Sequence, residues 1–259
     1  MIDNEPMKKI AAIVQSRMSS TRLPGKVMAK VVDKPLLSHV IRRAERSQIL
    51  NDVIVATTNN LSDDVIASYC AENSISCFRG SEDDVLDRYY HVALAYKIDT
   101  IVRITGDCPL LDPNVVDHVI QFYCSGNYDF VTNTLPCTYP DGLDVSVFSF
   151  AVLKQTWHES RLQSEREHVV PYIRNHPEIF NIGNVSHTED LSSFRWTVDE
   201  PQDLEFVRQV YGILGHDDFG MDDIVDLLQS KPELAQINQG IVRNEGYAKS
   251  LQNDRLIDR

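Results

Sequence analysis

The sequence of 259 residues contains no apolar run long enough to span a bilayer and no excess of positive charge. A membrane-spanning helix needs about 20 consecutive apolar residues. Residues 1–6 are acidic and lack the apolar segment of a signal peptide. Lysine and arginine number 25 against 38 aspartates and glutamates, for a formal net charge of −13. Because nucleic acids and anionic membranes attract positive surfaces, we expect neither as a partner.

Cysteine is also scarce, and its pattern argues against a Cys-x-x-Cys motif and against a disulfide framework. The five cysteines form no Cys-x-x-Cys pair, and an odd number fits a disulfide framework poorly. Free thiols are typical of the reducing cytoplasm, which is the expected location.

The length suits one large α/β domain, or one domain with an appendage.

Apolar segments alternate with amphipathic ones through the first half of the chain. Four segments read as strands: 10–14, 52–58, 76–79 and 100–105. Four segments between and after them read as helices: 34–44, 63–72, 84–95 and 114–123. This rhythm predicts an α/β fold with a mostly parallel, doubly wound sheet.

The pattern changes after residue 128. Short strands are expected at 130–133, 145–148, 180–185 and 195–198, as a small β-containing insertion, with helices at 150–157, 165–175 and 201–214. We place the main domain at 7–214 and a C-terminal helical extension at 215–259, with helices at 221–229 and 232–238. The charged stretch 245–259 is expected to fray.

The most informative stretch is the loop at 17–26, directly after the first strand. It holds the three cations Arg17, Arg22 and Lys26, beside hydroxyls that include Ser19 and Ser20. The stretch contains neither GxxxxGK[ST] nor GxGxxG, so it is neither a P-loop nor a dinucleotide fingerprint. A solvated basic loop is the alternative. We favour phosphate binding, because ligands dock at strand ends in α/β sheets and guanidinium groups match phosphate oxygens.

Two carboxylates also follow expected strands. Asp107 lies in Gly-Asp-Cys-Pro-Leu at 106–110, and Asp199 precedes Glu-Pro at 200–201. Mg²⁺ bound to a nucleotide is held by one or two carboxylates and by phosphate oxygens. From the residues alone, Asp107 could equally end a strand in a turn, and Asp199 is more simply a helix N-cap.

At this point the sequence resembles a known family. Residues 13–26, Ile-Val-Gln-Ser-Arg-Met-Ser-Ser-Thr-Arg-Leu-Pro-Gly-Lys, resemble the opening motif of the cytidylyltransferases that make CMP-sugars. The branch related to spore-coat polysaccharide biosynthesis is the best match. CMP-Kdo synthetases and acylneuraminate cytidylyltransferases are more distant relatives. The resemblance runs from about residue 9 to 207 and implies a nucleotide-diphospho-sugar transferase-like domain.

The resemblance assigns roles to particular residues. It implies that the opening loop holds the CTP phosphates and that Asp107 and Asp199 hold Mg²⁺, while Asp203 supports the start of a helix. It implies catalytic roles for Arg17, Lys26 and Asp107, and nucleotide binding by Arg17, Ser19, Ser20, Arg22, Lys26, Asp84 and Arg88.

Three further segments match the family but have plain alternatives. Residues 80–89 read as an acidic helix start, in which Arg88 would pair with Asp84. Residues 139–145 could be a simple turn, and 165–169 a solvated charged face. The resemblance places Arg166 and His168 near the acceptor, and Asp144 near either the acceptor or the metal. Ser146 stands where relatives usually have glutamate.

The resemblance implies a nucleotidyltransferase that joins CMP from CTP to a small anionic sugar or sugar acid, releasing pyrophosphate. It also implies a homodimer. Two other functions stay open from the sequence. One is a glycosyltransferase of similar fold, although the segment at Asp107 offers no Asp-x-Asp. The other is a nucleotide-binding module without catalysis.

Overall fold

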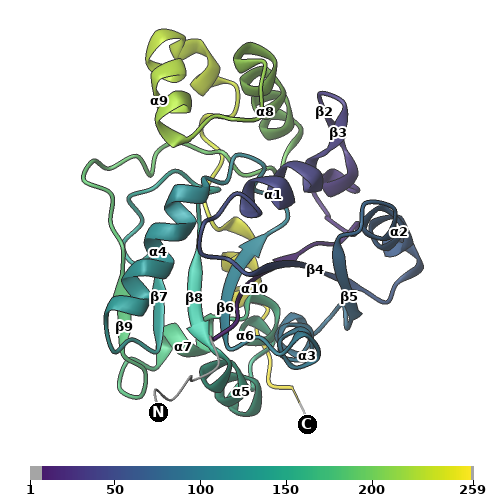
Figure 1. The fold of residues 1–259 in the computed structure, drawn as a ribbon, viewed down its shortest axis with the longest axis vertical. Helices are drawn as coiled ribbons and strands as arrows, with labels where there is room; N and C mark the ends of the chain where they lie inside the picture. The colour runs from purple at the N-terminus through teal and green to yellow at the C-terminus, as the bar shows by residue number, and fades with distance from the viewer. Residues whose placement is uncertain (1–7, 258–259) are drawn as a thin grey trace, which may run out of the picture.

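The computed structural model describes residues 8–257, and a single seven-stranded sheet runs through it (Figure 1). The strand order is β5-β4-β1-β6-β8-β7-β9. Only β8 runs antiparallel to its neighbours within this sheet. The strands are β1 Ile10–Gln15, β4 Asp52–Thr58, β5 Ser76–Gly80, β6 Thr100–Thr105, β7 Phe130–Thr132, β8 Ser146–Ser149 and β9 Ile182–Asn184. The fold is therefore α/β with a mostly parallel sheet, as predicted.

Helices cover both faces of the sheet and bury two apolar clusters. In β1, Ala12 and Val14 belong to one cluster, while Ala11 and Ile13 belong to the other, because successive strand side chains point to opposite faces. The first cluster is covered by α1 Leu36–Ala44, α2 Asp64–Glu72 and α4 Pro113–Ser125. The second is covered by α3 Val85–Tyr96, α5 Phe150–Glu159 and α7 Pro171–Asn175.

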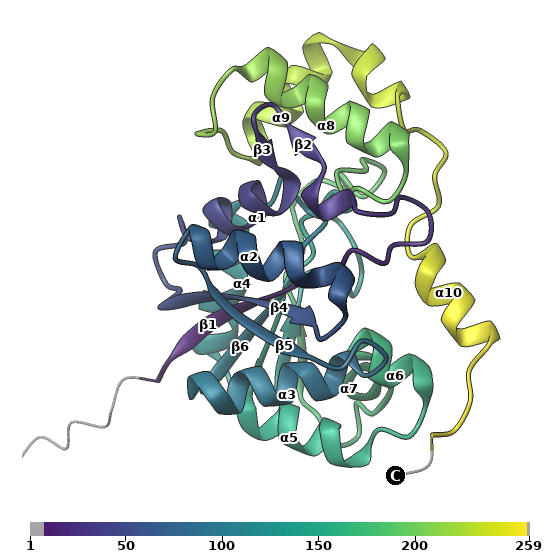
Figure 2. The same ribbon diagram turned by 90° about the vertical axis from the view of Figure 1, so that its right-hand side faces the viewer.

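The C-terminal part of the chain forms a further layer. The helix α8 Pro201–Leu214 packs beside the hairpin of β2 Lys30–Val31 and β3 Lys34–Pro35, and α9 Met221–Ser230 lies in the same lobe as α8 (Figure 2). Short 3-10 turns lie at Lys26–Met28 (η1), Leu61–Asp63 (η2) and Pro232–Gln236 (η3). Two helices remain, α6 Gln163–His168 and α10 Glu245–Gln252. The division between residues 214 and 215 stays a prediction.

Two expectations about elements were wrong. Residues 195–198 form no strand, and only an isolated bridge joins Asp141 to Arg195. The helix expected at 165–175 is broken into α6 and α7, because Val169 takes a positive φ of 72° that no α-helix accommodates. The stretch expected to fray contains α10, and its fraying stays a prediction. In addition, α1 begins at Leu36, since residues 34–35 pair in the hairpin.

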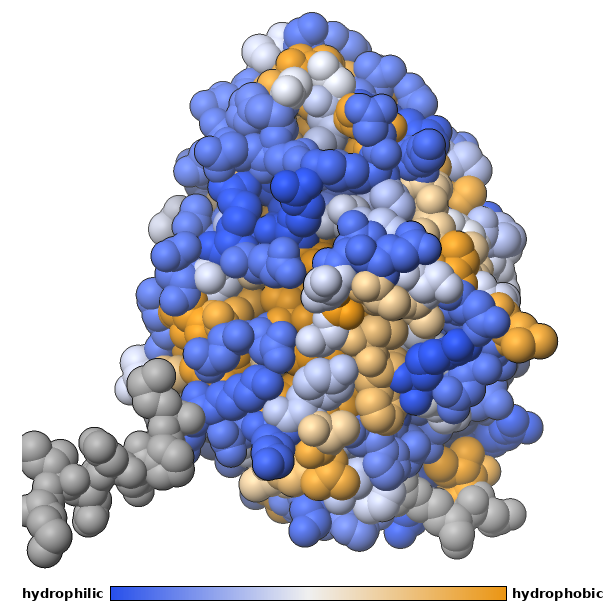
Figure 3. Space-filling model, turned by 45° about the vertical axis from the view of Figure 1, so that its right-hand side comes forward, coloured by the Kyte–Doolittle hydropathy of each residue, from blue (hydrophilic) through white to orange (hydrophobic). Residues whose placement is uncertain are grey.

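One face of the molecule is drawn in space-filling form (Figure 3). On the face drawn in Figure 3, hydrophilic residues predominate and hydrophobic ones lie in patches interrupted by them. Among residues 8–257, no helix combines the length and the apolar character that crossing a membrane requires.

Candidate active site

A pocket of about 300 Å³ opens where β1 and β6 end side by side. Its lining includes Ser16 and Arg17 after β1, and Gly106 and Asp107 after β6. A Cβ atom on Gly106 would lie only 2.8 Å from the carbonyl oxygen of Gln15, so a side chain there would push the two strand ends apart. Glycine at 106 is what allows both loops to face one pocket.

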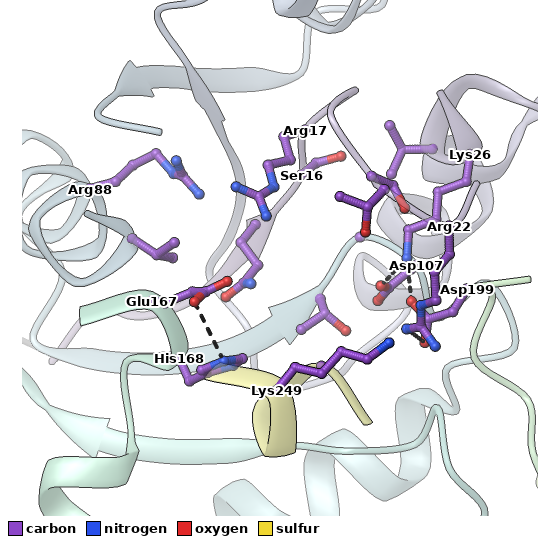
Figure 4. A pocket seen from close by; sticks show the side chains of 18 residues that line it. Ser16, Arg17, Arg22, Lys26, Arg88, Asp107, Glu167, His168, Asp199 and Lys249 are labelled. Carbon is purple, nitrogen blue, oxygen red and sulfur yellow. Dashed lines mark hydrogen bonds and ion pairs between the residues drawn. The ribbon is translucent and has the colours of Figure 1, made fainter. Parts of the chain in front are cut away.

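Lys26 stands at the centre of one wall of this pocket. Its ammonium nitrogen lies 2.7 Å from Asp107 Oδ2, 2.8 Å from Asp199 Oδ1 and 2.8 Å from the carbonyl oxygen of Val198. The Val198 amide donates to the carbonyl oxygen of Asp107 at 2.9 Å, which fixes the two carboxylate-bearing segments together. Lys26, predicted to bind phosphate, is therefore in direct contact with Asp107 and Asp199, both predicted to bind the metal (Figure 4).

The charges in this contact stabilise one another. Burial disfavours the charged forms of Lys26 and Asp107, yet their mutual attraction prevails. The Asp107 and Asp199 carboxylates raise the pKa of Lys26 above its usual 10.5. Despite burial, Lys26 lowers the pKa of Asp107 to about 2. Both groups are consequently charged at neutral pH.

Asp199 is not the helix cap that its position before Pro201 suggested. Glu200 is the N-cap residue of α8, and the Asp203 carboxylate accepts from the backbone amides of Asp199 and Glu200, each at 2.9 Å. Asp203 thus supports the helix start, as predicted. The Asp199 side chain is left to face the pocket.

Arg22 completes this wall. Its guanidinium lies 3.0 Å from Asp199, 3.4 Å from Glu200 and 3.1 Å from Glu245. Arg22 and Lys26 therefore share the Asp199 carboxylate. Two of the predicted cations, Arg22 and Lys26, thus lie together and are already balanced by acidic groups.

Arg195, which the sequence did not single out, supports Asp199 from behind. This buried guanidinium lies 2.9 Å from each of Asp141, Asp199 and Asp203. Asp203 has no exposed surface, and Arg195 lowers its pKa against the opposing effect of burial. The Arg195 contacts hold the start of α8 and the pocket carboxylate in one network.

The opposite end of the pocket has unsatisfied polar atoms. Arg17 and Arg88 point into the pocket from the side away from Lys26 (Figure 4). Gln15 Oε1, Ser16 Oγ and Arg88 Nε are buried and have no hydrogen-bond partner within residues 8–257, although all three residues line the pocket. Buried polar groups are seldom left unpaired, so this end is suited to a polar ligand.

The expected Arg88–Asp84 pair was wrong. Arg88 donates to the carbonyl oxygen of Ser81, and Asp84 caps α3 by accepting from the Asp87 amide. Asp84 pairs instead with Arg166, which is only 2% exposed. Their contact joins α3 to α6, and neither side chain lines the pocket, so the structure does not bring these two predicted ligands to it.

Of the other predicted ligands, some line the pocket and others do not. Ser20 and His168 line the pocket, whereas Ser19 is exposed and donates to Glu82. Asp144 lies outside the lining and binds Arg243 at 2.5 Å; burial raises the pKa of Asp144 although Arg243 opposes this. Burial lowers the pKa of His168 to about 4, so this imidazole is neutral at physiological pH.

Sequence reasoning missed several lining residues. Gln15 and Ser16 could have been found, since they follow directly on the first strand. Glu167 lies beside the predicted His168. Gly246 and Lys249 come from α10, and no sequence pattern connected that helix with the loop at 17–26.

Comparison with known proteins agrees with this geometry. A family model described as cytidylyltransferase matches residues 11–238. The chain belongs to the cytidylyltransferase family. It is therefore a member of an enzyme family of nucleotidyltransferases, as the opening motif predicted.

Individual members of the cytidylyltransferase family span nearly the whole chain. The spore coat polysaccharide biosynthesis protein SpsF of Bacillus subtilis is 32% identical over 239 residues, which cover 88% of this chain and 98% of SpsF. The structure of a cytidylyltransferase from Leptospira borgpetersenii has a TM-score of 0.86 at 34% identity, covering 91% of this chain and all of that one. A CMP:2-keto-3-deoxy-manno-octonic acid synthetase complexed with CTP shares the fold, with a TM-score of 0.63 at 18% identity over 80% of this chain and 100% of its own.

Proposed function

We propose that this protein transfers CMP from CTP to a hydroxyl group of a small anionic sugar and releases pyrophosphate. The observation that carries the proposal is the pocket at the ends of β1 and β6. There Arg22 and Lys26 meet Asp107 and Asp199 at one end, and Arg17 lines the other end. Membership of the cytidylyltransferase family supports the choice of nucleotide. The relation to SpsF supports a product used in polysaccharide biosynthesis.

In the proposed reaction, the acceptor oxygen forms a bond to the α-phosphorus of CTP while the bond from that phosphorus to the bridging oxygen of pyrophosphate breaks. The hydroxyl proton passes to solvent. Arg17, Arg22 and Lys26 would stabilise the negative charge that accumulates on the departing pyrophosphate. Such transfers depend mainly on positioning and electrostatics, because little covalent chemistry is left to the protein.

The donor set at the pocket also fits a divalent cation such as Mg²⁺. Asp107 and Asp199 both direct oxygens at one point, where Lys26 Nζ lies. No cluster of three or more His, Cys, Asp or Glu residues that could hold a metal occurs among residues 8–257. Two carboxylates completed by phosphate oxygens are the ligands that Mg²⁺ commonly takes. A cation that took the place of the Lys26 ammonium group between these two carboxylates would polarise the phosphate oxygens.

The acceptor end of the proposed site lies beside α6. His168 lines the pocket next to Glu167, and Ser250 donates to Glu167 at 2.9 Å. A neutral imidazole can form a hydrogen bond with a hydroxyl group of the sugar that accepts CMP, and it does not repel a nearby cation. Arg166 and Asp144 would then act indirectly, Arg166 by holding α6 and Asp144 by holding Arg243.

Binding of CTP, UTP, GTP and ATP, each with Mg²⁺, tests this function by calorimetry. We expect CTP to bind at least about tenfold more tightly than the others, a difference of roughly 1.4 kcal/mol. Arg22→Ala should weaken CTP binding, whereas Arg42→Ala, at an exposed position on α1, should not. Preference for another base would contradict the assignment of cytidine.

Turnover separates the proposed reaction from its rivals. An acceptor screen should detect pyrophosphate release from CTP with an anionic sugar. A glycosyltransferase would instead consume a nucleotide-sugar without releasing pyrophosphate, and a binding module would show no turnover with any acceptor. The homodimer also remains a proposal, and light scattering at micromolar concentration would reveal a monomer if it is wrong.

A further inference from the structure

The C-terminal helix α10 lies against the pocket, although the family match ends at residue 238. Figure 2 shows α10 standing between the lobe of α8 and α9 and the helix α6. Gly246 and Lys249 of this helix line the pocket together with Arg22 and His168. A segment beyond the family's common core therefore contributes to the wall of the proposed site.

Polar contacts hold α10 in this position. None of its residues is buried. Ser250 Oγ lies 2.9 Å from His168 Nε2, and the Tyr247 ring packs edge-on against His168 at 5.0 Å between centroids. Helices held without buried apolar side chains open at low free-energy cost, because water replaces the lost contacts. Movement of α10 would thus leave the sheet and its two cores intact.

Glu245, the first residue of α10, is shared between two cations that face the pocket. Its carboxylate lies 3.1 Å from Arg22 and 2.7 Å from Lys249. Figure 4 shows the Lys249 side chain extending along the pocket, with its ammonium group directed toward Arg22 and Asp199. The hydrogen bond from Lys249 is the main reason that the pKa of Glu245 is lowered.

We propose that α10 is a lid over the triphosphate and that Lys249 is an additional phosphate-binding residue. Without ligand, the Glu245 carboxylate forms ion pairs with Arg22 and Lys249. Phosphate oxygens replace this carboxylate when the triphosphate binds. The inference rests on the proposed function only for the nature of the ligand, a polyphosphate. Phosphate oxygens bear more negative charge than one carboxylate and can pair with both cations at once. Glu245 is partly exposed and can return to water when it is displaced.

Calorimetric binding of inorganic tripolyphosphate to the full chain tests this role without depending on the base. We expect Lys249→Ala to weaken binding about tenfold, the value of one charge-assisted contact. Glu245→Gln should strengthen binding about twofold, because it removes a competing charge from an exposed pair. Lys231→Ala, at an exposed position outside the pocket lining, should leave the affinity unchanged.

Hydrogen exchange provides the second readout. Amides of residues 245–252 should exchange more slowly in the presence of tripolyphosphate, and Lys249→Ala should abolish that protection. Equal affinity of wild type and Lys249→Ala, no tripolyphosphate binding by wild type, or unchanged exchange in α10 would each overturn the proposal. Lys249-dependent tripolyphosphate binding without a preference for CTP would instead sink the proposed function and leave the lid standing. Selective CTP turnover that is unaffected by Lys249→Ala would contradict the lid and leave the proposed function standing.

Discussion

The ammonium group of Lys26 lies 2.7 Å from the carboxylate of Asp107, across 81 residues of sequence. This pair joins the loop after β1 to the loop after β6, and it sets the charge state of the pocket. Lys26 is 7% exposed, so its positive charge is stabilised by protein carboxylates more than by water.

Lys26→Met should destabilise the protein, because Asp107 and Asp199 would then face each other without the cation. Removing one partner of a fully buried pair costs roughly 3–5 kcal/mol. We expect about 2 kcal/mol here, since both carboxylates are partly exposed. Urea unfolding measures the change, and adding Asp107→Asn to Lys26→Met should restore part of the loss. A double variant no more stable than the single one would contradict this account.

The same pair predicts how stability changes in acid. Asp107 has a folded pKa of about 2, below its usual 3.8, so its ionised form is favoured by folding. Its contribution is fully present above about pH 4 and is lost as the pH falls through about 2. Unfolding midpoints of wild type and Asp107→Asn, measured from pH 5 to pH 2, should therefore converge toward the acid end. A constant difference would show that Asp107 does not titrate as expected.

Asp107→Asn should also abolish most turnover while preserving the fold. The amide oxygen of asparagine can still accept a hydrogen bond from Lys26, but it is a poor ligand for a divalent cation. We expect kcat to fall by about 10²-fold or more, as for other electrostatic groups at transferring phosphates. Pyrophosphate release measures the effect, with Asp226→Asn on the exposed face of α9 as the control. Full activity in Asp107→Asn would remove the metal assignment.

Arg195→Met should be among the most destabilising changes near the site. Among residues 8–257, it leaves the buried carboxylate of Asp203 without its cationic partner, and Asp141 with only Arg243, at 3.6 Å. The loss should be roughly 3–5 kcal/mol, which corresponds to a fall in Tm of about 2–4 °C for each kcal/mol. Calorimetry checks the value against Arg208→Met, an exposed position on α8. Similar midpoints for the two variants would refute the structural role of Arg195.

His168 should not titrate near neutral pH. Burial lowers its pKa to about 4, from the usual 6.5. The imidazole proton resonances of His168, assigned by comparison with His168→Gln, should stay constant between pH 8 and pH 5.5. Movement through that range would show that His168 gains a proton near neutral pH, against its lowered pKa.

Local sequence patterns were sufficient for much of the fold. The bounds of β4, β6 and α8 agree with expectation, because each is a strongly periodic or apolar run with a clear start and end. The pattern failed at 195–198, where apolar residues alternate as in a strand. The Arg195 side chain instead packs among three carboxylates, and the backbone follows that network rather than a sheet.

The same division holds for the candidate site. The five residues Arg17, Arg22, Lys26, Asp107 and Asp199 line the pocket, and the sequence pointed to them through the loop after the first strand and through the family motifs. It wrongly paired Arg88 with Asp84 from their helical spacing. The buried guanidinium of Arg166 offered Asp84 a closer partner from another helix.

By itself, the sequence determined the alternation of strands and helices, and with it the edge of the sheet where the cations and carboxylates had to meet. Only the tertiary structure decided which charges neutralise one another, and that α10 lines the pocket. The Arg22–Glu245 contact spans 223 residues, and no local periodicity encodes it. Secondary structure follows from neighbours along the chain, whereas the partners of a charged side chain depend on which distant segments the packed core brings within a few ångströms.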